Sequence, residues 1–499
     1  MEKIAASLLA TAGIACAQTY NYDSSSETLV ITGKGNTVAD RITLEGPITP
    51  GSTVPGTSEI FGDTKEIILK DVWTSPDSIR IKYVEPTSEG NNTTLKLENS
   101  RLGASGDFDK GGTGLILILD SQSNLTLFGN RLTNTIRIEN QGNIRCTNGT
   151  VSASSYLWDN KTTTGSSGVL GGSGYYSFGN VSSIETNKDF GLIKTSGQIT
   201  DLEISGIYTV DGNSAKTIDD DSYIVGVNTS SSSDGQAMTI SGSLTINAKQ
   251  GTGIGILANQ LGSDDVSLKN NYSGQIYVTA KDAFGVKVGK NAAMDPSAAG
   301  DIYSLSVGEL DIESTITSGS TQGEATGIYA KSVKRDLTAN AITVKGYTNA
   351  TGIHLTEGGR NLTISDMQVS AGISGNAAGI IAAPGRDNPV STAGNLENIR
   401  IDNLEVSGGA DATGIFANSI TKSGQNENII GNITVSSENG LANGIFADNA
   451  DITLGGKILS SSENSNAYGI WTQNDLFLKM LAGSEISAIA ANENSSAQA

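Results

Sequence analysis

Apolar and polar residues alternate over short stretches along much of this chain. Residues 305–312 read LSVGELDI, which is two alternating runs separated by Gly308-Glu309. The same arrangement occurs at residues 337–344, 362–369 and 399–406. An apolar period of two is that of a β-strand with one apolar face, and Gly, Asn, Asp and Ser between the runs tolerate a bend. The pattern predicts pairs of short strands joined by a tight corner.

A second pattern is a repeated motif of a small residue, any residue, Gly-Ile, a bulky residue and usually Ala. The copies are ATGIYA at 325–330, ATGIH at 350–354, AAGIIA at 377–382, ATGIFA at 412–417, ANGIFA at 442–447 and AYGIW at 467–471. Weaker copies are Gly226-Val227, Gly255-Ile256 and Gly285-Val286. Successive glycines are mostly 25 to 35 residues apart. That spacing is typical of a repeat array, in which each unit is one supersecondary element.

Together the two patterns give a unit of three short strands that cannot bury its apolar face alone. Stacking the units buries those faces and pairs the backbone groups of neighbouring units. No apolar period near 3.6 residues competes with this interpretation. We therefore expect an all-β chain, a single right-handed parallel β-helix (β-solenoid) with three short strands per rung.

We expect three regions along the chain. Residues 1–17 form a signal peptide, residues 18–213 an N-terminal cap with irregular rungs, and residues 214–499 regular Gly-Ile rungs truncated at the C-terminus. The first strands after Gln18 are the natural cap, because an uncovered strand edge invites association with other chains. The Ser/Gly-rich stretch 162–174 is expected to be a loop or a weak boundary.

Alternation also predicts the direction of side chains in the Gly-Ile strand. If Ile328 and Ala330 face inward, the intervening Tyr329 faces outward. The matching positions are Leu257, Lys287, His354, Ile381, Phe416, Phe446 and Trp471. We expect an outward-facing contact column for a glycan or a protein, made by Tyr329, His354, Phe416, Phe446 and Trp471. In the alternative interpretation, the following loops cover these side chains and they only pack.

Composition and charge narrow the class of protein. The chain has 61 Gly and 8 Pro among 499 residues, and its formal net charge is −20. Scarce proline argues against a disordered linker. The sequence shows no basic stripe of the kind that binds nucleic acid, so no nucleic-acid partner is expected.

The first residues predict export. Lys3 is followed by an apolar run at residues 4–10, and Ala15-Cys16-Ala17 precedes Gln18 with small residues where a signal peptidase cleaves. A lipoprotein signal at Cys16 is disfavoured, because Gly13 stands where a branched apolar residue is usual. Cleavage after Ala17 leaves Cys146 alone, and we expect it to be a small apolar filler in a strand rather than a nucleophile.

Candidate chemistry is sparse. His354 is the one histidine, no Gly-x-Ser-x-Gly elbow occurs, and zinc-ligand spacing is absent, so we predict no catalytic, cofactor-binding or metal-binding residues. The acidic run Asp219, Asp220 and Asp221 is expected to be a solvated turn, with a cation site or part of a carboxylate cluster as the sharper alternative. A carbohydrate-active β-helix enzyme, either a polysaccharide lyase or a glycosidase, remains the alternative to a non-enzyme, because such sites gather carboxylates on successive rungs.

The predicted leader, the scarce cysteine, the Gly/Asn/Ser/Thr-rich β composition and the Gly-Ile repeats resemble the passenger region of a bacterial autotransporter (type V secretion). The resemblance implies display on the outer surface or release, in adhesion, aggregation or host contact. It implies a host-surface protein or glycan, or self-association, as partner. Members place a membrane β-barrel after the passenger, and the last residues here resemble 462–467, which precede Tyr468-Gly469-Ile470. We therefore expect a fragment of a longer precursor. A truncated gene and a structural stalk remain open alternatives.

Overall fold

The computed structural model is an all-β chain whose strands are stacked parallel to one another. It describes residues 19–23, 28–32, 59–61, 66–70, 82–84, 93–104, 115–128, 132–133, 135–147, 150–151, 155–160, 166–171, 175–179, 183–184, 188–195, 199–212, 216–217, 223–231, 235–290, 296–315, 323–385, 393–424, 426–492 and 495–499. The predicted leader, residues 1–17, lies outside the described residues. In the described part of the chain, no helix is long and apolar enough to cross a membrane.

The strands of the first half are short. They are β1 (Thr19–Asp23), β2 (Thr28–Thr32), β3 (Glu59–Phe61), β4 (Glu66–Lys70), β5 (Lys82–Val84), β6 (Thr93–Glu98), β7 (Arg101–Ala104), β8 (Leu115–Leu119), β9 (Asn124–Phe128), β10 (Leu132–Thr133), β11 (Thr135–Asn140), β12 (Asn143–Thr147), β13 (Thr150–Val151), β14 (Ser155–Asn160), β15 (Ser166–Gly171), β16 (Tyr175–Gly179), β17 (Ser183–Ile184), β18 (Asp189–Thr195), β19 (Ile199–Ile204), β20 (Ile207–Asp211) and β21 (Lys216–Thr217).

Many strands of the second half are longer, because several run through a corner without a break. They are β22 (Tyr223–Thr229), β23 (Met238–Ile240), β24 (Ser243–Ala258), β25 (Asn270–Val288), β26 (Asp301–Ser314), β27 (Glu324–Gly346), β28 (Asn349–Arg360), β29 (Leu362–Ala371), β30 (Asn376–Ala382), β31 (Asn395–Glu397), β32 (Arg400–Gly408), β33 (Ala412–Thr421), β34 (Ile429–Ser437), β35 (Ala442–Leu454), β36 (Lys457–Ser462), β37 (Ala467–Thr472), β38 (Leu476–Met480), β39 (Glu485–Ala490) and β40 (Ala497–Gln498). A short 3-10 helix, η1 (Pro296–Ala298), lies between β25 and β26.

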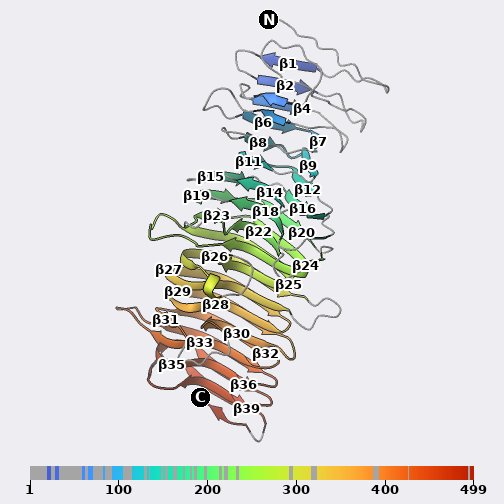
Figure 1. Ribbon diagram of the computed structural model, residues 1–499. Helices are drawn as coiled ribbons and strands as arrows, with labels where there is room; N and C mark the ends of the chain where they lie inside the picture. Colours follow the sequence, from blue (N-terminus) through green and yellow to red (C-terminus); the bar gives the residue numbers. More distant parts are fainter. Residues whose placement is uncertain are drawn as a thin grey trace.

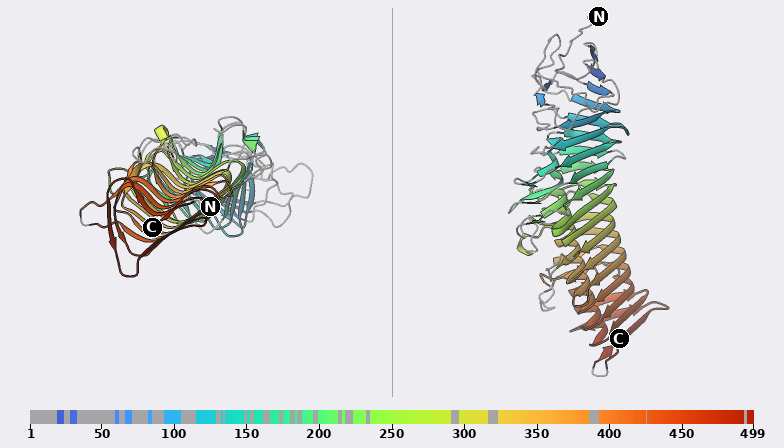
Figure 2. Two further views of the ribbon diagram at one scale, coloured as in Figure 1. Left: turned by 90° about the horizontal axis from the view of Figure 1, so that it is seen from below. Right: turned by 90° about the vertical axis from the view of Figure 1, so that its right-hand side faces the viewer.

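Thirty-five of these strands form one hydrogen-bonded sheet, in which each repeat pairs with the repeats before and after it. Between β27 and the next repeat, for example, Tyr329 pairs with His354, Leu337 with Leu362, and Ile342 with Met367, all in parallel. The strands pile up along one axis, with β1 and β39 at opposite ends (Figures 1 and 2). The prediction of parallel, repeat-to-repeat strand pairing is therefore confirmed. We call each repeat in this stack a layer.

The core follows the predicted alternation. Ile328 and Ala330 are fully buried in one continuous apolar cluster, together with Leu337 and Ile342 from the other two strand segments of that layer. Corresponding residues of every regular layer join the same cluster, so apolar side chains stack on their own counterparts through the array. Burial of these faces is the main stabilising term for such a stack.

The glycine of each Gly-Ile motif has a packing role that periodicity did not reveal. A Cβ atom on Gly327 would lie 2.5 Å from the carbonyl oxygen of Gly352 and 2.9 Å from Ile342 Cγ2, closer than van der Waals contact allows. Gly379 is placed in the same way against Gly414 and Leu404. The backbone of this strand therefore approaches both the next layer and the core so closely that no side chain fits.

Asparagine forms one of the corners. Asn361 and Asn398 have φ angles of 52° and 54°, in the left-handed region that asparagine tolerates better than other non-glycine residues. They occupy the same corner in adjacent layers, and Asn398 Nδ2 donates to Asn361 Oδ1 at 3.1 Å. Each corner side chain thus also links one layer to the next.

The first strands differ from the rest in direction. β1 pairs antiparallel with β2, whereas β2 pairs parallel with β4, so the first layer ends in a hairpin. That position agrees with a cap, although the boundary at residue 213 stays a prediction. The expectation of a loop through 162–174 is wrong for residues 166–171, because β15 pairs there with both β11 and β19.

The glycine contacts generate a stability prediction. Gly327→Ala is expected to lower the free energy of unfolding by about 1–3 kcal/mol, because the added methyl group overpacks the core and pushes two layers apart. Chemical denaturation followed by circular dichroism measures it.

Gly455→Ala is the matched control. The nearest atoms to a Cβ there lie 3.8 and 3.9 Å away, so a change within about 0.5 kcal/mol is expected. Equal losses in the two variants would contradict the packing role of Gly327.

Candidate functional site

One row of side chains runs along the outer face of the Gly-Ile strands through ten consecutive layers. Register pairing places one residue per layer in this row, which we call the outer column. Its members are Lys194, Asn228, Leu257, Lys287, Tyr329, His354, Ile381, Phe416, Phe446 and Trp471. The alternation therefore predicted the row correctly, and register pairing continues upstream of Asn228 through Lys194 to Asp159 and Thr133.

The middle of the outer column is covered, which agrees with the interpretation that following loops bury these side chains and not with an accessible contact column. Tyr329 is 1% exposed and His354 is 5% exposed, although both point away from the main core. Tyr329 belongs to a separate apolar cluster with Leu257 and Phe284. The physical reason is that segments of this chain fold back over the outer face and bury it.

The first covering segment, residues 289–300, follows β25. Of this segment the structure describes residues 289–290 and 296–300; Gly289 bridges Ala299 antiparallel, and Lys290 N donates to the Ala298 carbonyl oxygen at 3.1 Å, so its two ends lie side by side. Ala299 packs against the cluster that contains Tyr329. Figure 1 shows η1, which belongs to this segment, on the outside of the stacked strands.

The second covering segment follows β30, and the structure describes its two ends, residues 383–385 and 393–394. Ala383 and Ala393 pack with Ile381, and His354 Nε2 lies 2.9 Å from the Ala383 carbonyl oxygen. The His354 ring also meets Tyr329 edge to face, with centroids 5.2 Å apart. The one histidine of the chain is therefore a packing residue held between two neighbouring layers and a covering loop.

The last three members of the outer column are half-buried aromatic residues. The rings of Phe416 and Phe446 stack with centroids 5.6 Å apart and an interplanar angle of 10°. Phe446 and Trp471 stack at 4.2 Å and 7°. Like Tyr329 and His354 these residues point away from the main core, but they keep part of their surface accessible. We call the three residues the aromatic strip.

The strip has a defined chemistry because its rings are parallel. Phe446 has a neighbouring ring on each of its two faces, so it presents its edge outward. Ring edges carry the positive part of the aromatic quadrupole and accept apolar groups or carbonyl oxygens against them. The strip is therefore an apolar contact surface, and Phe446 lacks an open ring face on which another planar group could stack.

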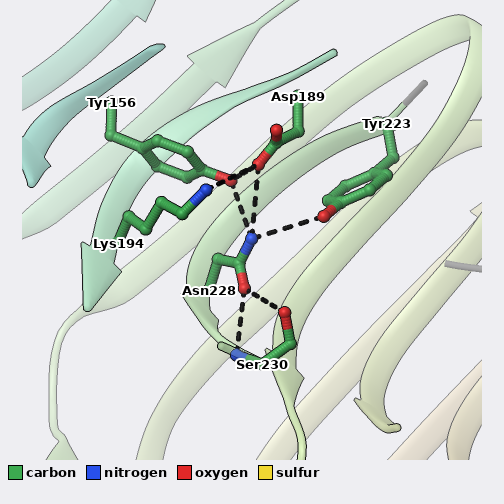
Figure 3. A network of polar contacts seen from close by, with 6 residues as sticks. All are labelled: Tyr156, Asp189, Lys194, Tyr223, Asn228 and Ser230. Atoms are coloured by element: carbon green, nitrogen blue, oxygen red, sulfur yellow. Dashed lines mark hydrogen bonds and ion pairs between the residues drawn. The ribbon is translucent and has the colours of Figure 1, made fainter. Parts of the chain in front are cut away.

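At the opposite end, the outer face carries a buried polar network from three layers (Figure 3). The Tyr156 hydroxyl donates to Asp189 Oδ2, and Asn228 Nδ2 donates to the Tyr156 hydroxyl at 2.8 Å. Asn228 Nδ2 is also 3.3 Å from Asp189 Oδ2 and 3.4 Å from the Tyr223 hydroxyl. Lys194 Nζ lies 3.7 Å from Asp189 Oδ2. The carboxylate thus receives donors from every side.

Burial keeps the two tyrosine hydroxyls of the network protonated. Burial raises the pKa of Tyr156 well above its ordinary value, and the nearby Asp189 charge raises it further. The pKa of Tyr223 is also raised by burial and then by Asp189. Both phenols stay protonated across the physiological range; the Tyr156 hydroxyl donates to Asp189, and the Tyr223 hydroxyl accepts from Asn228 Nδ2. The arrangement holds three layers together through polar contacts, and neither phenol is poised to transfer a proton.

Lys287 is an unusual member of the outer column, because its side chain is 1% exposed. Its Nζ atom lies 4.6 Å from the centroid of the Phe284 ring and 4.3 Å from that of Tyr329. These ring contacts favour the charged ammonium. Burial opposes them and lowers the pKa of Lys287 to about 7.

The other residues singled out by sequence contribute little here. Asp219, Asp220 and Asp221 lie outside the described residues. Cys146 lies on β12, in register with Leu127 and Phe178. Among the residues that the structure does describe, no group of three or more His, Cys, Asp or Glu side chains could hold a metal ion.

Sequence reasoning missed the polar network entirely. Lys194 and Asn228 carry the signal, since Lys194 follows Leu192-Ile193 and Asn228 follows Gly226-Val227, at the position that the bulky residue occupies in later repeats. Extending the Gly-Ile motif from Gly226 toward the N-terminus would have identified them. Tyr156 and Asp189 carry no such signal, because they reach the network from other positions of their strands.

Comparison with known proteins adds no relative. No family profile, no curated protein and no solved structure matches this chain.

The network yields a first prediction. Asn228→Ala is expected to destabilise the chain by about 1–3 kcal/mol, because it removes a donor from a buried carboxylate and a partner from a buried phenol. Thermal and chemical denaturation measure the change. Asn432→Ala removes an exposed amide that donates to Asn403, and it should cost less than about 0.5 kcal/mol. Comparable losses in both variants would argue against a special role of the network.

Lys287 yields a pH prediction. In the unfolded chain a lysine titrates near about 10.4, whereas Lys287 titrates at about 7 in the folded chain. Between these values the unfolded state holds one more proton, so this lysine makes stability rise with pH. Lys287→Met should therefore stabilise the chain most at pH 7 and below, and the gain should shrink as the pH approaches 10.

Melting temperatures from pH 6 to pH 9.5 test this expectation. Lys345→Met, an exposed substitution on β27, is the control and should show a nearly constant difference from the wild type. A constant difference for Lys287→Met as well would show that burial does not shift its titration.

Proposed function

We propose that the chain is a single right-handed parallel β-helix with three short strands per rung. The support is the unbroken register of the outer column through ten layers, together with the pairing of all three strand segments with their counterparts one repeat away. A chain wound in this way satisfies its backbone through its neighbours and leaves long lateral faces for contact. The same architecture is typical of autotransporter passengers, which the sequence resembles.

We further propose that the protein is an exported, surface-displayed passenger that acts in adhesion, aggregation or host contact. The observation that carries this proposal is the aromatic strip, three stacked and half-buried rings on the lateral face. A row of aromatic rings that stays partly accessible on a lateral face marks a contact site more often than isolated apolar residues do. The leader-like residues 1–17 and the net charge of −20 agree with a secreted protein that stays dispersed.

Deletion of the coding segment in the native bacterium tests the proposal. Attachment to host cells or clumping should fall by about tenfold or more, because display of many copies makes adhesion multivalent. Re-expression of the wild-type chain should restore it. Attachment and clumping that are unchanged after deletion would exclude an adhesive role.

A further inference from the structure

Lys194 and Asn228 are neighbours in the outer column. They are register partners on β18 and β22, so their side chains leave adjacent strands on the same face. Strands paired in this way lie about 4.8 Å apart, a distance that the long, flexible side chain of a lysine spans easily. The fold therefore holds a primary amine next to a carboxamide.

The carboxylate of Asp189 contacts both groups. Its Oδ2 atom lies 3.7 Å from Lys194 Nζ and 3.3 Å from Asn228 Nδ2 (Figure 3). Asp189 is 6% exposed and Asn228 is 1% exposed, so the carboxylate and the amide are withdrawn from water. Away from water, an ammonium–carboxylate pair loses much of its advantage over the neutral amine and acid, because both charges lose their hydration. Transfer of one proton from Lys194 to Asp189 leaves a nucleophilic amine beside a protonated acid.

The side-chain carbonyl oxygen of Asn228 accepts two hydrogen bonds. Ser230 N donates to Asn228 Oδ1 at 3.0 Å, and Ser230 Oγ donates to the same atom at 2.7 Å. Donors placed in this way stabilise the negative charge that develops on a carbonyl oxygen when an amine adds to its carbon. The amide of Asn228 thus has a carboxyl group at its nitrogen and two donors at its oxygen.

We propose that Lys194 and Asn228 form an intramolecular isopeptide bond, with Asp189 as the catalytic proton carrier. The Lys194 amine adds to Asn228 Cγ while Ser230 stabilises the charge on Oδ1. Asp189 gives its proton to Nδ2 and accepts one from the attacking nitrogen. The Cγ–Nδ2 bond breaks, and ammonia leaves as ammonium with the proton that Asp189 then holds. A Cγ–Nζ amide joins β18 to β22, and because one amide replaces another, the reaction needs no oxidant, reductant or activated group.

Lys457 provides a contrast within the same chain. Its Nζ atom lies 2.8 Å from Glu485 Oε2, and its backbone nitrogen donates to Asn432 Oδ1. The side chains of Lys457 and Glu485 are 53% and 51% exposed, however, so water stabilises both charges. Lys457 should therefore remain a free amine although a carboxylate and an asparagine lie beside it.

Tryptic digestion of the denatured full chain, followed by mass spectrometry, tests the bond. Trypsin does not cleave after an acylated lysine, so residues 189–216 should stay intact and should be joined to residues 217–249. This branched peptide should be lighter than its two components together by the mass of one ammonia molecule. Cleavage after Lys457 in the same digest is the internal control. A peptide that ends at Lys194, without any branched species, would overturn the proposal.

Two variants separate the chemistry from packing. Lys194→Arg keeps a positive charge beside Asp189, but a guanidinium stays protonated and does not attack an amide, so the branched peptide should disappear while the circular dichroism spectrum is unchanged. Asp189→Asn keeps the shape of the carboxyl group but cannot carry the proton, and it should reduce the cross-linked fraction about tenfold or more. Cross-linking as complete in Asp189→Asn as in the wild type would contradict the catalytic role of Asp189.

Loss of ammonia has a second possible source, because an asparagine before a glycine can close to a succinimide. That product lies in a linear peptide, whereas the isopeptide bond produces a branched one. A mass deficit found only in linear peptides would therefore overturn the proposal. The wild-type digest decides this point by itself, so the result holds even if a substitution disturbs the fold.

Discussion

The structure depends on one constraint, that the strands after β1 pair in parallel and in register with the strand one repeat away. Hydrogen bonds between layers fix their separation at about 4.8 Å, so a residue meets its own counterparts above and below it. Whatever occurs once in the repeat therefore becomes a column along the axis. The apolar core, the asparagine corners and the stacked rings all follow from this single repetition.

The glycine of the motif shows how tight the constraint is. From Gly226 to Gly444 its backbone lies against the carbonyl oxygen of the next glycine and against an apolar side chain of the core, so the position takes no side chain there, whereas Leu192 holds it one layer upstream. The outer column, in contrast, accepts many residue types. Lysine, asparagine, tyrosine, histidine, isoleucine and tryptophan all occur there, because only the register is fixed and the environment outside is free to vary.

The sequence predicts those features that repetition controls. Alternation correctly assigned Ile328 to the core and Tyr329 to the opposite face, and the spacing of the glycines correctly predicted which residues stack. It left open whether Tyr329 and His354 are accessible or covered, because the insertions that cover them have no period and no register. It also missed the network around Asn228, since buried polar contacts between different strand positions leave no pattern in a single chain. Local periodicity thus determines the stack of paired strands, and irregular segments determine which side chains of the stack are exposed.

The glycine row has a consequence for how such a chain changes over generations. Each layer fits its neighbour through backbone atoms that are the same in every copy, so the junction between any two layers is interchangeable. Gain or loss of a complete repeat would restore an equivalent junction between two layers. Gain or loss of part of a repeat would leave two neighbouring layers out of register. Natural variants of this protein should therefore differ in length by whole repeats, and their genes should recombine within the motif itself.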